Sequence, residues 1–386
     1  MDITLSDEQD LVYRTALQFA QDAMPREKLR DAEVAEPGFD PAVWRQMAAL
    51  GWTAMPFRPE YGGGFSLLDL GLVIEACARA ALPAPFFSTV VEAGLLIDEC
   101  GSPALRDAWL PRIAAGTALL TTAVLEPNAG LGPRDIQASI TVTTTGYRLS
   151  GTKLFVRHAA AAEAIAVVGR SDPDANHLTW LLVPRDLPGV VVERMPASGA
   201  EPLYAVTFDD VELGIPALVG EINDGWAPLR RLLLRGAALK AMELVGIGQA
   251  ALDLTVAYAQ SRVQFGRPIG TFQAVHHHAA DMYRDLQSAR LLAWQAAARL
   301  ARPDDPTREV AMAKAKASEV VPGIARTAHQ IHGGVGYYTD YPLGVYYNNA
   351  TAAQAAYGNA AHHRAELAEL LRQSPQYLRP DLGHMR

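Results

Sequence analysis

The pattern of apolar and polar residues divides the chain into three consecutive blocks. In residues 5–116 the apolar residues recur with helical spacing, as in LLDLGLVIEACARAAL. In residues 117–221 the apolar runs are short, β-branched and bounded by Gly, Pro or Asp, which predicts antiparallel strands; these runs are ASITVTTTGYRL, AIAVVGR, HLTWLLVPR, GVVVERM and YAVTFDDVEL. After the turn at 223–225 the helical spacing returns, which predicts a long helix over about 226–265 and two or three further helices.

Composition and charge narrow the class of protein. The chain has 386 residues, of which 49% are apolar and 20% are charged, the balance of a soluble globular protein of two or three domains. The net charge of −8 argues against a nucleic-acid partner, and no apolar run reaches the roughly 18 residues of a membrane span. The start, MDITLSDEQD, lacks a basic region before an apolar stretch, so we expect no signal peptide and a cytoplasmic protein in which Cys77 and Cys100 are buried, reduced thiols.

Glycine and proline interrupt the helical pattern within residues 258–273, YAQSRVQFGRPIGTFQ. The spacing predicts a helix that ends at Phe265, with Gly266 as its left-handed stop and Pro268 just beyond. Thr271 is the expected N-cap of the next helix. We therefore expect a junction between two helices here.

Groups suited to an anion gather at this junction and in a second segment, residues 330–342. Arg262 lies about one turn before the predicted helix end, where its planar guanidinium can reach an anion, and Gln264 and Gln273 offer amide groups nearby. The second segment, QIHGGVGYYTDYP, breaks another helix with three glycines, which let a ligand approach the backbone; these are Gly333, Gly334 and Gly336. An arginine fork beside glycine-lined backbone suits a diphosphate.

Together the two segments resemble the C-terminal signatures of the acyl-CoA dehydrogenase family, R-x-x-F-G-x-x-I-x-x-F-Q and Q-x-x-G-G-x-G. Further matches follow in the family's order over nearly the whole chain: LSDEQDLVYRTALQFA, PEYGGG, LEPNAG and GYRLSGTKLFV. The resemblance implies an α+β fold with an N-terminal α-helical domain (1–116), a middle antiparallel, β-barrel-like domain (117–222) and a C-terminal four-helix bundle (223–386). It also implies an FAD cofactor, an acyl-CoA substrate and an acceptor similar to electron-transfer flavoprotein.

The same resemblance identifies candidate cofactor-binding residues at the end of FAD that carries the ADP. They are Arg262, Gln264, Phe265, Ile269, Phe272, Gln273, Gln330, Gly333 and Gly334.

The catalytic position of the family is altered in this chain. Family members remove the substrate α-proton with a glutamate at one of two places, and here these places hold Tyr357 and Gly236. Neither is a carboxylate, and a tyrosine with an ordinary pKa of about 10 is a poor base for this task. Glu243 lies two turns after Gly236 on the same helix face, but we interpret it as an ion-pair partner of Lys240; we interpret Arg235 as a surface residue. No catalytic residue is therefore assigned.

The positions that contact the flavin ring in the family are altered too. Leu125 and Leu131 stand where the family has a hydroxyl residue, Phe155–Val156–Arg157 replaces W-I-T, and Asn359 replaces the threonine of E-G-T. A polar ring edge that faces leucine loses hydrogen bonds, at a cost of about 1–3 kcal/mol each. The flavin site of this chain's own middle domain is therefore expected to be degraded.

The chain lacks the family's glutamate and flavin-ring contacts but keeps the groups for the ADP end of FAD, and this combination is typical of one kind of subunit. In the family each FAD lies between two chains, and this chain keeps only the set of groups that serves its neighbour's FAD. It resembles the non-catalytic member of a two-plus-two heterotetramer of the kind used in bacterial steroid side-chain breakdown. The alternative is a homotetramer with glutamate-independent chemistry, such as elimination from a functionalised acyl-CoA. A purely structural subunit would leave Arg262 and the glycines without a role.

The histidines do not indicate a metal site. His276, His277 and His278 are consecutive in a predicted helix, where side chains point about 100° apart and do not converge on one ion. His362 and His363 are interpreted as solvated helix residues, and the tail after Gln373 as irregular.

Overall fold

The computed structural model describes residues 4–25, 28, 37–128, 130–172, 177–199 and 201–373. The first part of the chain is helical, as its sequence pattern predicts, and comprises α1 (Asp7–Ala23), α3 (Pro41–Ala49), α4 (Leu67–Arg79), a π-helical segment (Phe86–Gly94), α5 (Leu95–Cys100) and α6 (Pro103–Ala114). Ser6 and Ser66 begin α1 and α4 with capping boxes that satisfy free backbone N–H groups. Helix α4 is buried over most of its length and packs on α7 of the last domain.

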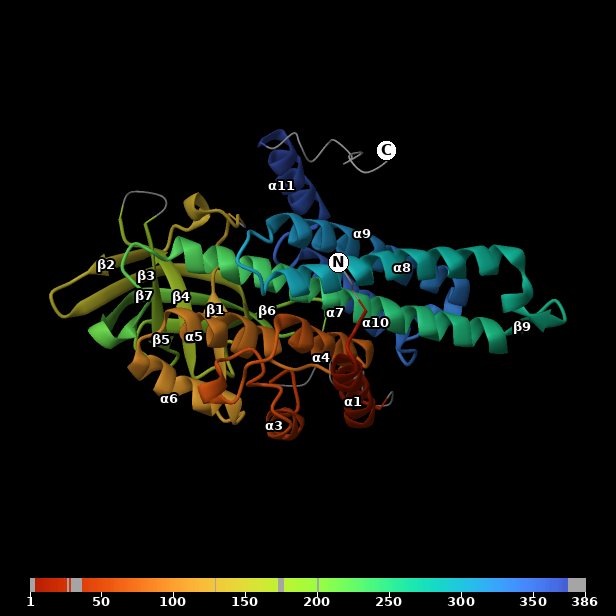
Figure 1. The fold of residues 1–386 in the computed structure, drawn as a ribbon, viewed down its shortest axis with the longest axis horizontal. Helices are drawn as coiled ribbons and strands as arrows, with labels where there is room; N and C mark the ends of the chain where they lie inside the picture. The colour runs from red at the N-terminus through yellow and green to blue at the C-terminus, as the bar shows by residue number, and fades with distance from the viewer. Residues whose placement is uncertain are drawn as a thin grey trace, which may run out of the picture.

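An eight-stranded sheet forms the middle of the chain (Figure 1). Its strands are β1 (Leu120–Ala123), β2 (Ser139–Val142), β3 (Gly146–Arg157), β4 (Ala164–Arg170), β5 (Leu178–Pro184), β6 (Val190–Met195), β7 (Leu203–Gly214) and β8 (Leu218–Val219). The order is β6-β7-β3-β2-β4-β5-β8, with β1 beside β4. Most pairs are antiparallel, as the short alternating runs predict, whereas β1 and β2 each meet β4 in parallel.

Long helices run side by side through the last part of the chain and extend away from the sheet (Figure 1). The long helices are α7 (Trp226–Ser261), α8 (Gln273–Arg299) and α9 (Thr307–His332). The shorter α10 (Leu343–Ala355) and α11 (Ala360–Gln373) pack on α9, and α11 projects from the other helices (Figure 1). The predicted α+β fold of helices, sheet and helices is confirmed. The tail after Gln373 lies outside the described residues. None of the helices in the described ranges combines the length and the apolar character needed to cross a bilayer.

The junction after α7 differs from the sequence prediction. The helix ends at Ser261 rather than Phe265, and the chain then forms a hairpin in which β9 (Val263–Gln264) pairs with β10 (Arg267–Pro268). Phe265 and Gly266 have φ of 53° and 79°, the left-handed pair that a tight hairpin turn requires. Gly266 is thus left-handed as predicted, but it closes a hairpin. The N-cap of α8 is Phe272, not Thr271, which lies in a 3-10 turn.

Candidate functional site

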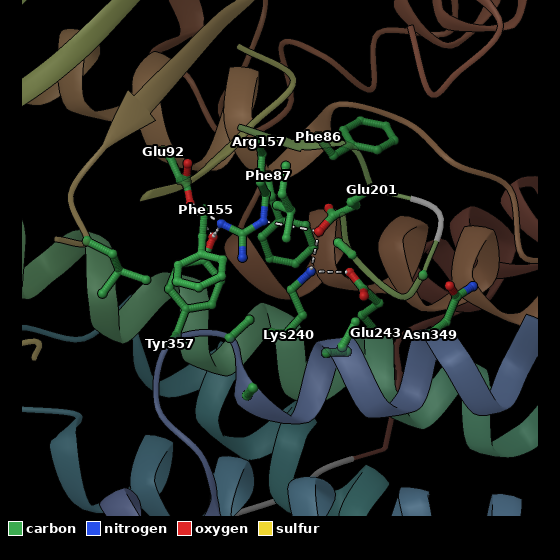
Figure 2. A pocket seen from close by; sticks show the side chains of 18 of the residues that line it. Phe86, Phe87, Glu92, Phe155, Arg157, Glu201, Lys240, Glu243, Asn349 and Tyr357 are labelled. Carbon is green, nitrogen blue, oxygen red and sulfur yellow. Dashed lines mark hydrogen bonds and ion pairs between the residues drawn. The ribbon is translucent and has the colours of Figure 1, made fainter. Parts of the chain in front are cut away.

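A cavity of about 690 Å³ lies where the helical parts of the chain meet the sheet. Figure 2 shows side chains from several elements directed into it. Much of its wall is apolar and includes Leu82, Phe86, Phe87, Leu125, Leu131 and Ile247. Tyr357, in the short segment between α10 and α11, closes one side.

Five charged side chains form a line along one wall of this cavity (Figure 2). Arg157 on β3 donates to Glu92 over 3.0 Å and to Glu201 over 3.1 Å. Lys240 on α7 lies 3.6 Å from the Glu201 carboxylate and donates to Glu243 over 2.8 Å. The order is therefore Glu92, Arg157, Glu201, Lys240, Glu243, with the signs alternating and a carboxylate at each end. The predicted Lys240–Glu243 ion pair is present.

Burial and the neighbouring charges shift the pKa values along this line in opposite directions. Burial opposes ionisation of Glu201, but the attraction of Lys240 and Arg157 outweighs it and lowers the pKa of this carboxyl to about 2. Burial raises the pKa of Glu243, and Lys240 offsets only part of this effect. Glu201 is thus held as a carboxylate, whereas Glu243 takes up a proton more readily than an exposed glutamate.

Tyr357 is part of the same network and is not available as a base. Its hydroxyl donates to Glu92, and the guanidinium of Arg157 lies 5.0 Å from the centre of its ring. Burial is the main cause that raises the pKa of Tyr357 well above its ordinary value, and Arg157 only partly opposes it. The tyrosine therefore stays protonated at neutral pH.

The two altered catalytic positions meet in space. A Cβ added to Gly236 would lie 2.3–2.6 Å from three ring carbons of Tyr357, which is far inside van der Waals contact. The glycine thus makes room for the tyrosine ring. A carboxylate introduced at Gly236 would meet this ring before it reached the cavity.

Buried groups on α9 and α11 hold the segment that carries Tyr357. Lys314 on α9 donates to the carbonyls of Gln354 and Gly358 over 2.9 and 2.8 Å. His363 donates its Nε2–H to the carbonyl of Tyr357 over 3.0 Å. His363 is only 3% exposed, so its interpretation as a solvated residue is wrong; His362 is exposed, as expected.

The segments expected to bind the ADP end of FAD lie together at the other end of α7. The Tyr258 ring stacks on His332 with a centroid separation of 4.4 Å, which brings the hairpin after α7 close to the glycine segment after α9. The Arg262 side chain is exposed and has no hydrogen bond within the described part of the chain. A Cβ at Gly333 or Gly334 would meet no atom within 4 Å, so these glycines present open backbone to the outside.

The other predicted cofactor-binding residues share this exposed end. Phe265 is 93% exposed, and the amide of Gln264 turns back to the carbonyl of Val263. Ile269 and Phe272 are both partly buried beside the hairpin. Gln273 begins α8, and Gln330 is exposed near the end of α9.

The exposed end and the cavity lie at different places along α7. At 1.5 Å per residue, Arg262 lies about 39 Å along the helix from Gly236 and about 22 Å from Ile247, the cavity-lining residue of α7 that is nearest to it in sequence.

Family models match in sequence over each of these three parts. The acyl-CoA dehydrogenase N-terminal domain matches residues 6–117, the middle domain matches 121–211, and the C-terminal domain matches 223–371. The chain belongs to the acyl-CoA dehydrogenase family.

Similar sequences and solved structures span nearly the whole chain. The acryloyl-CoA reductase (NADH) of Anaerotignum propionicum is 30% identical and covers 95% of each chain. The solved butyryl-CoA dehydrogenase of Megasphaera elsdenii has a TM-score of 0.90 at 27% identity, covering 96% of this chain and all of that one. The ChsE4–ChsE5 complex of Mycobacterium tuberculosis has a TM-score of 0.88 at 27% identity, covering 97% of this chain and all of the matched one.

The cavity of this acyl-CoA dehydrogenase homologue does not fit a flavin ring. Leu125 and Leu131 face it with apolar side chains, and the polar atoms of Arg157 are held between Glu92 and Glu201. Phe155 has φ of 57° within a β-bulge and is 43% exposed. The cavity-facing side chains thus offer the polar edge of an isoalloxazine ring few free hydrogen-bond partners.

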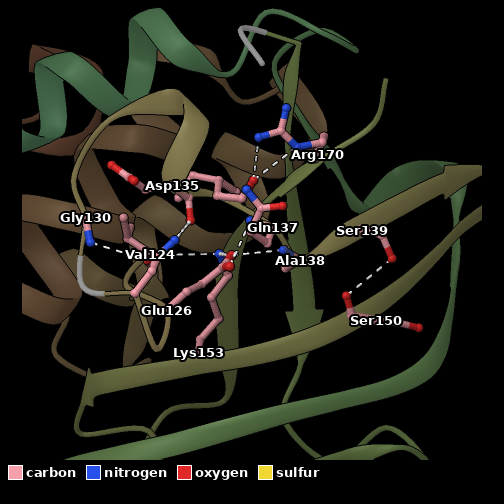
Figure 3. Close-up of polar contacts among 12 residues, drawn as sticks. Val124, Glu126, Gly130, Asp135, Gln137, Ala138, Ser139, Ser150, Lys153 and Arg170 are labelled. Atoms are coloured by element: carbon pink, nitrogen blue, oxygen red, sulfur yellow. Dashed lines mark hydrogen bonds and ion pairs between the residues drawn. The ribbon is translucent and has the colours of Figure 1, made fainter. Parts of the chain in front are cut away.

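Some residues that match the family in the middle domain are structural (Figure 3). Lys153 of the GTK motif is fully buried and lies 2.7 Å from Glu126 of LEPNAG. Glu126 also accepts the backbone N–H groups of Gln137 and Ala138 over 2.8 and 3.0 Å. Burial lowers the pKa of Lys153 to about 8. The match at these motifs therefore reflects a shared framework, while the positions that face the cavity differ.

Sequence reasoning missed two cavity residues and misplaced Arg235, which is not part of the cavity wall. Glu92 interrupts the apolar run FFSTVVEAGLLI, and a lone acid in such a run is a signal for a buried polar site; Glu201 lies in an irregular loop with no comparable signal. Arg235 is 4% exposed and pairs with Glu99, so its interpretation as a surface residue is wrong. Cys77 is buried as expected, whereas Cys100 is only partly buried.

Proposed function

We propose that this chain is the non-catalytic subunit of a heteromeric, FAD-dependent acyl-CoA dehydrogenase that desaturates the α,β bond of a bulky or steroid-like acyl-CoA thioester. One observation carries the proposal. The two places where the family puts its glutamate hold Tyr357 and Gly236, which pack against each other and leave no carboxylate there. The catalytic glutamate must then come from a homologous partner chain in a two-plus-two heterotetramer.

The exposed end of α7 is the part of this chain that fits the cofactor. Arg262 has a free guanidinium that suits a pyrophosphate, and Gly333 and Gly334 leave backbone open to it. Gln330 adds an exposed amide beside them. FAD held there would supply the hydride acceptor for the partner's active site, and an acceptor like electron-transfer flavoprotein would reoxidise it.

Expression with and without a partner tests the proposal. The chain alone is expected to be colourless and inactive, because its own cavity offers few flavin contacts and neither of the family's two base positions holds a carboxylate. Co-expression with a glutamate-bearing homologue is expected to give a yellow complex with dye-linked acyl-CoA oxidation. Stoichiometric FAD and dehydrogenase activity in the chain alone would contradict the proposal.

A second candidate is a homotetramer that acts on a functionalised acyl-CoA without a glutamate base. The observation in its favour is that the cavity remains open at about 690 Å³ and keeps an organised line of charges. An as-isolated homotetramer with one flavin per chain and elimination activity would establish it over the first candidate.

A further inference from the structure

The charges on the cavity wall do not balance. Glu92, Glu201 and Glu243 supply three carboxyl groups, whereas Arg157 and Lys240 supply two cations. All five line the same cavity, and burial strengthens the interactions among them. Each cation lies between two carboxylates, so a further anion would find no uncompensated positive charge on this wall.

The first end of the line, at Glu92, is fully engaged. One of its oxygens accepts from Arg157 and from the Tyr357 hydroxyl, and the other accepts from Thr122. A ligand would have to break these buried hydrogen bonds to reach this carboxylate.

The other end, at Glu243, has an unused oxygen. Oε2 accepts from Lys240, whereas Oε1 has no hydrogen bond within the described ranges. The side chain is 19% exposed, into the cavity that it lines. Lys240 is itself only 1% exposed and lies 3.7 Å above the Phe87 ring, so it is not free to turn toward a ligand. In Figure 2, Glu243 lies at the end of the line away from Tyr357.

We propose that Glu243 makes the cavity of this chain selective for ligands whose apolar part carries a hydrogen-bond donor, such as a hydroxyl group, over ligands that carry a second carboxylate. Oε1 accepts the hydrogen bond of the donor. The apolar wall formed by Leu82, Phe87 and Ile247 covers the rest of the ligand. An extra carboxylate would place a fourth carboxyl group beside two cations that are already paired. The inference concerns the cavity alone and holds whether or not this chain binds flavin.

Three CoA thioesters of equal chain length test this selectivity: octanoyl-CoA, 8-hydroxyoctanoyl-CoA and octanedioyl-CoA. Binding to the chain expressed alone is measured by titration calorimetry, without added FAD, so that the result does not depend on catalysis. We expect 8-hydroxyoctanoyl-CoA to bind about tenfold more tightly than octanoyl-CoA, since a hydrogen bond to a charged group contributes this much. We expect octanedioyl-CoA to bind most weakly.

Two substitutions at Glu243 separate hydrogen bonding from charge. Glu243→Leu should abolish the preference for the hydroxyl thioester. Glu243→Gln keeps an oxygen acceptor, so it should keep the hydroxyl preference and reduce the discrimination against octanedioyl-CoA. The control is Glu369→Gln on α11, whose carboxylate pairs with the exposed Arg372 on the surface.

Any of four results would overturn the proposal. Equal or tighter binding of octanoyl-CoA to the wild-type chain would show that no donor is selected. An unchanged preference for the hydroxyl thioester in a folded Glu243→Leu variant would show that Glu243 does not set this preference. Unchanged discrimination against octanedioyl-CoA in Glu243→Gln would show that the charge of Glu243 does not exclude the dicarboxylate. Failure of all three thioesters to bind would show that the cavity is not a ligand site. Flavin content of the co-expressed complex is a separate measurement, so failure of one proposal is distinguishable from failure of the other.

Discussion

At the scale of single residues, the site is defined by one glycine and one tyrosine that lie far apart in sequence. The resemblance to the family singled out Gly236 and Tyr357 as the altered positions. It could not show that the tyrosine ring fills the space above the glycine, because that contact depends on how α7 and the segment before α11 pack. Nor could it show that Arg157 is held by Glu92 and Glu201.

The contact between these residues predicts an unusual effect of alanine. Alanine normally stabilises a helix over glycine by about 1 kcal/mol, yet Gly236→Ala should destabilise the chain by about 1–3 kcal/mol through overpacking. Gly323→Ala on α9 is the matched control, since its nearest neighbour is an arginine nitrogen 3.9 Å away, and it should be neutral or stabilising. Urea unfolding measures both. A stabilised Gly236→Ala variant would contradict the packing.

A carboxylate at this position should not restore catalysis. Gly236→Glu is expected to be destabilised for the same steric reason, and the cavity offers few contacts to hold the flavin that would accept the hydride. Dye-linked oxidation of a panel of acyl-CoAs, with and without added FAD, measures the result. Clear turnover by this single variant would show that the flavin site of the chain itself is sound.

The hydroxyl of Tyr357 should contribute measurably to stability. Tyr357→Phe removes a buried donor from Glu92 and should lower the free energy of unfolding by about 1–3 kcal/mol. Tyr283→Phe, on the exposed side of α8, should have no comparable effect. Equal effects of the two substitutions in urea unfolding would refute the role of this hydrogen bond.

At the scale of elements, hydrophobic periodicity predicted the helices and strands better than their ends. The strands of the sheet were predicted because their β-branched runs are short and clearly bounded. The end of α7 was misplaced because Gly266 is left-handed both in a helix stop and in a hairpin turn, and only the pairing of β9 with β10 distinguishes the two.

Lys314 on α9 donates hydrogen bonds to the segment before α11, and its burial predicts that the stability of the chain depends on pH. Burial lowers the pKa of Lys314 to about 7, below the 10.5 of an exposed lysine. Between these values the unfolded chain binds more protons than the folded chain, so the contribution of Lys314 to stability rises with pH. Relative to Lys314→Met, the wild type should gain roughly 1 kcal/mol per pH unit over the lower part of this window. The measurement is urea unfolding at pH 7, 8 and 9.

The neighbouring Lys316 provides the control for this experiment. It is partly exposed, pairs with Asp285 and, among the described residues, makes no hydrogen bond to the segment before α11, so Lys316→Met removes a lysine from the same helix without removing the contacts of Lys314. A difference between wild type and Lys314→Met that is constant from pH 7 to 9 would show that Lys314 does not titrate in this range.

At the scale of the whole molecule, the sequence was sufficient to predict the α+β fold and the family. It was not sufficient to place the two candidate sites relative to each other. Along α7, Arg262 lies about 39 Å from Gly236 and about 22 Å from Ile247 on the cavity wall. The proposed assembly assigns the cavity and the exposed Arg262 end to different ligand sites.

The exposed end of α7 should control flavin binding in that assembly. In the co-expressed complex, Arg262→Ala should lower the flavin content severalfold, because it removes the guanidinium expected to hold the pyrophosphate. Arg284→Ala, an exposed arginine that pairs with Asp281 on α8, is the control. Absorbance at 450 nm per mole of complex measures the result. Unchanged flavin content in Arg262→Ala would favour a purely structural subunit.

The central claim is that this chain's own cavity holds no flavin while its exposed end serves the cofactor of a partner. The most direct measurement is the ratio of FAD to polypeptide in the purified complex with a glutamate-bearing homologue, from native mass spectrometry. The account predicts two FAD molecules in a tetramer of two plus two chains. Four FAD molecules in that tetramer, one for each chain, would contradict it.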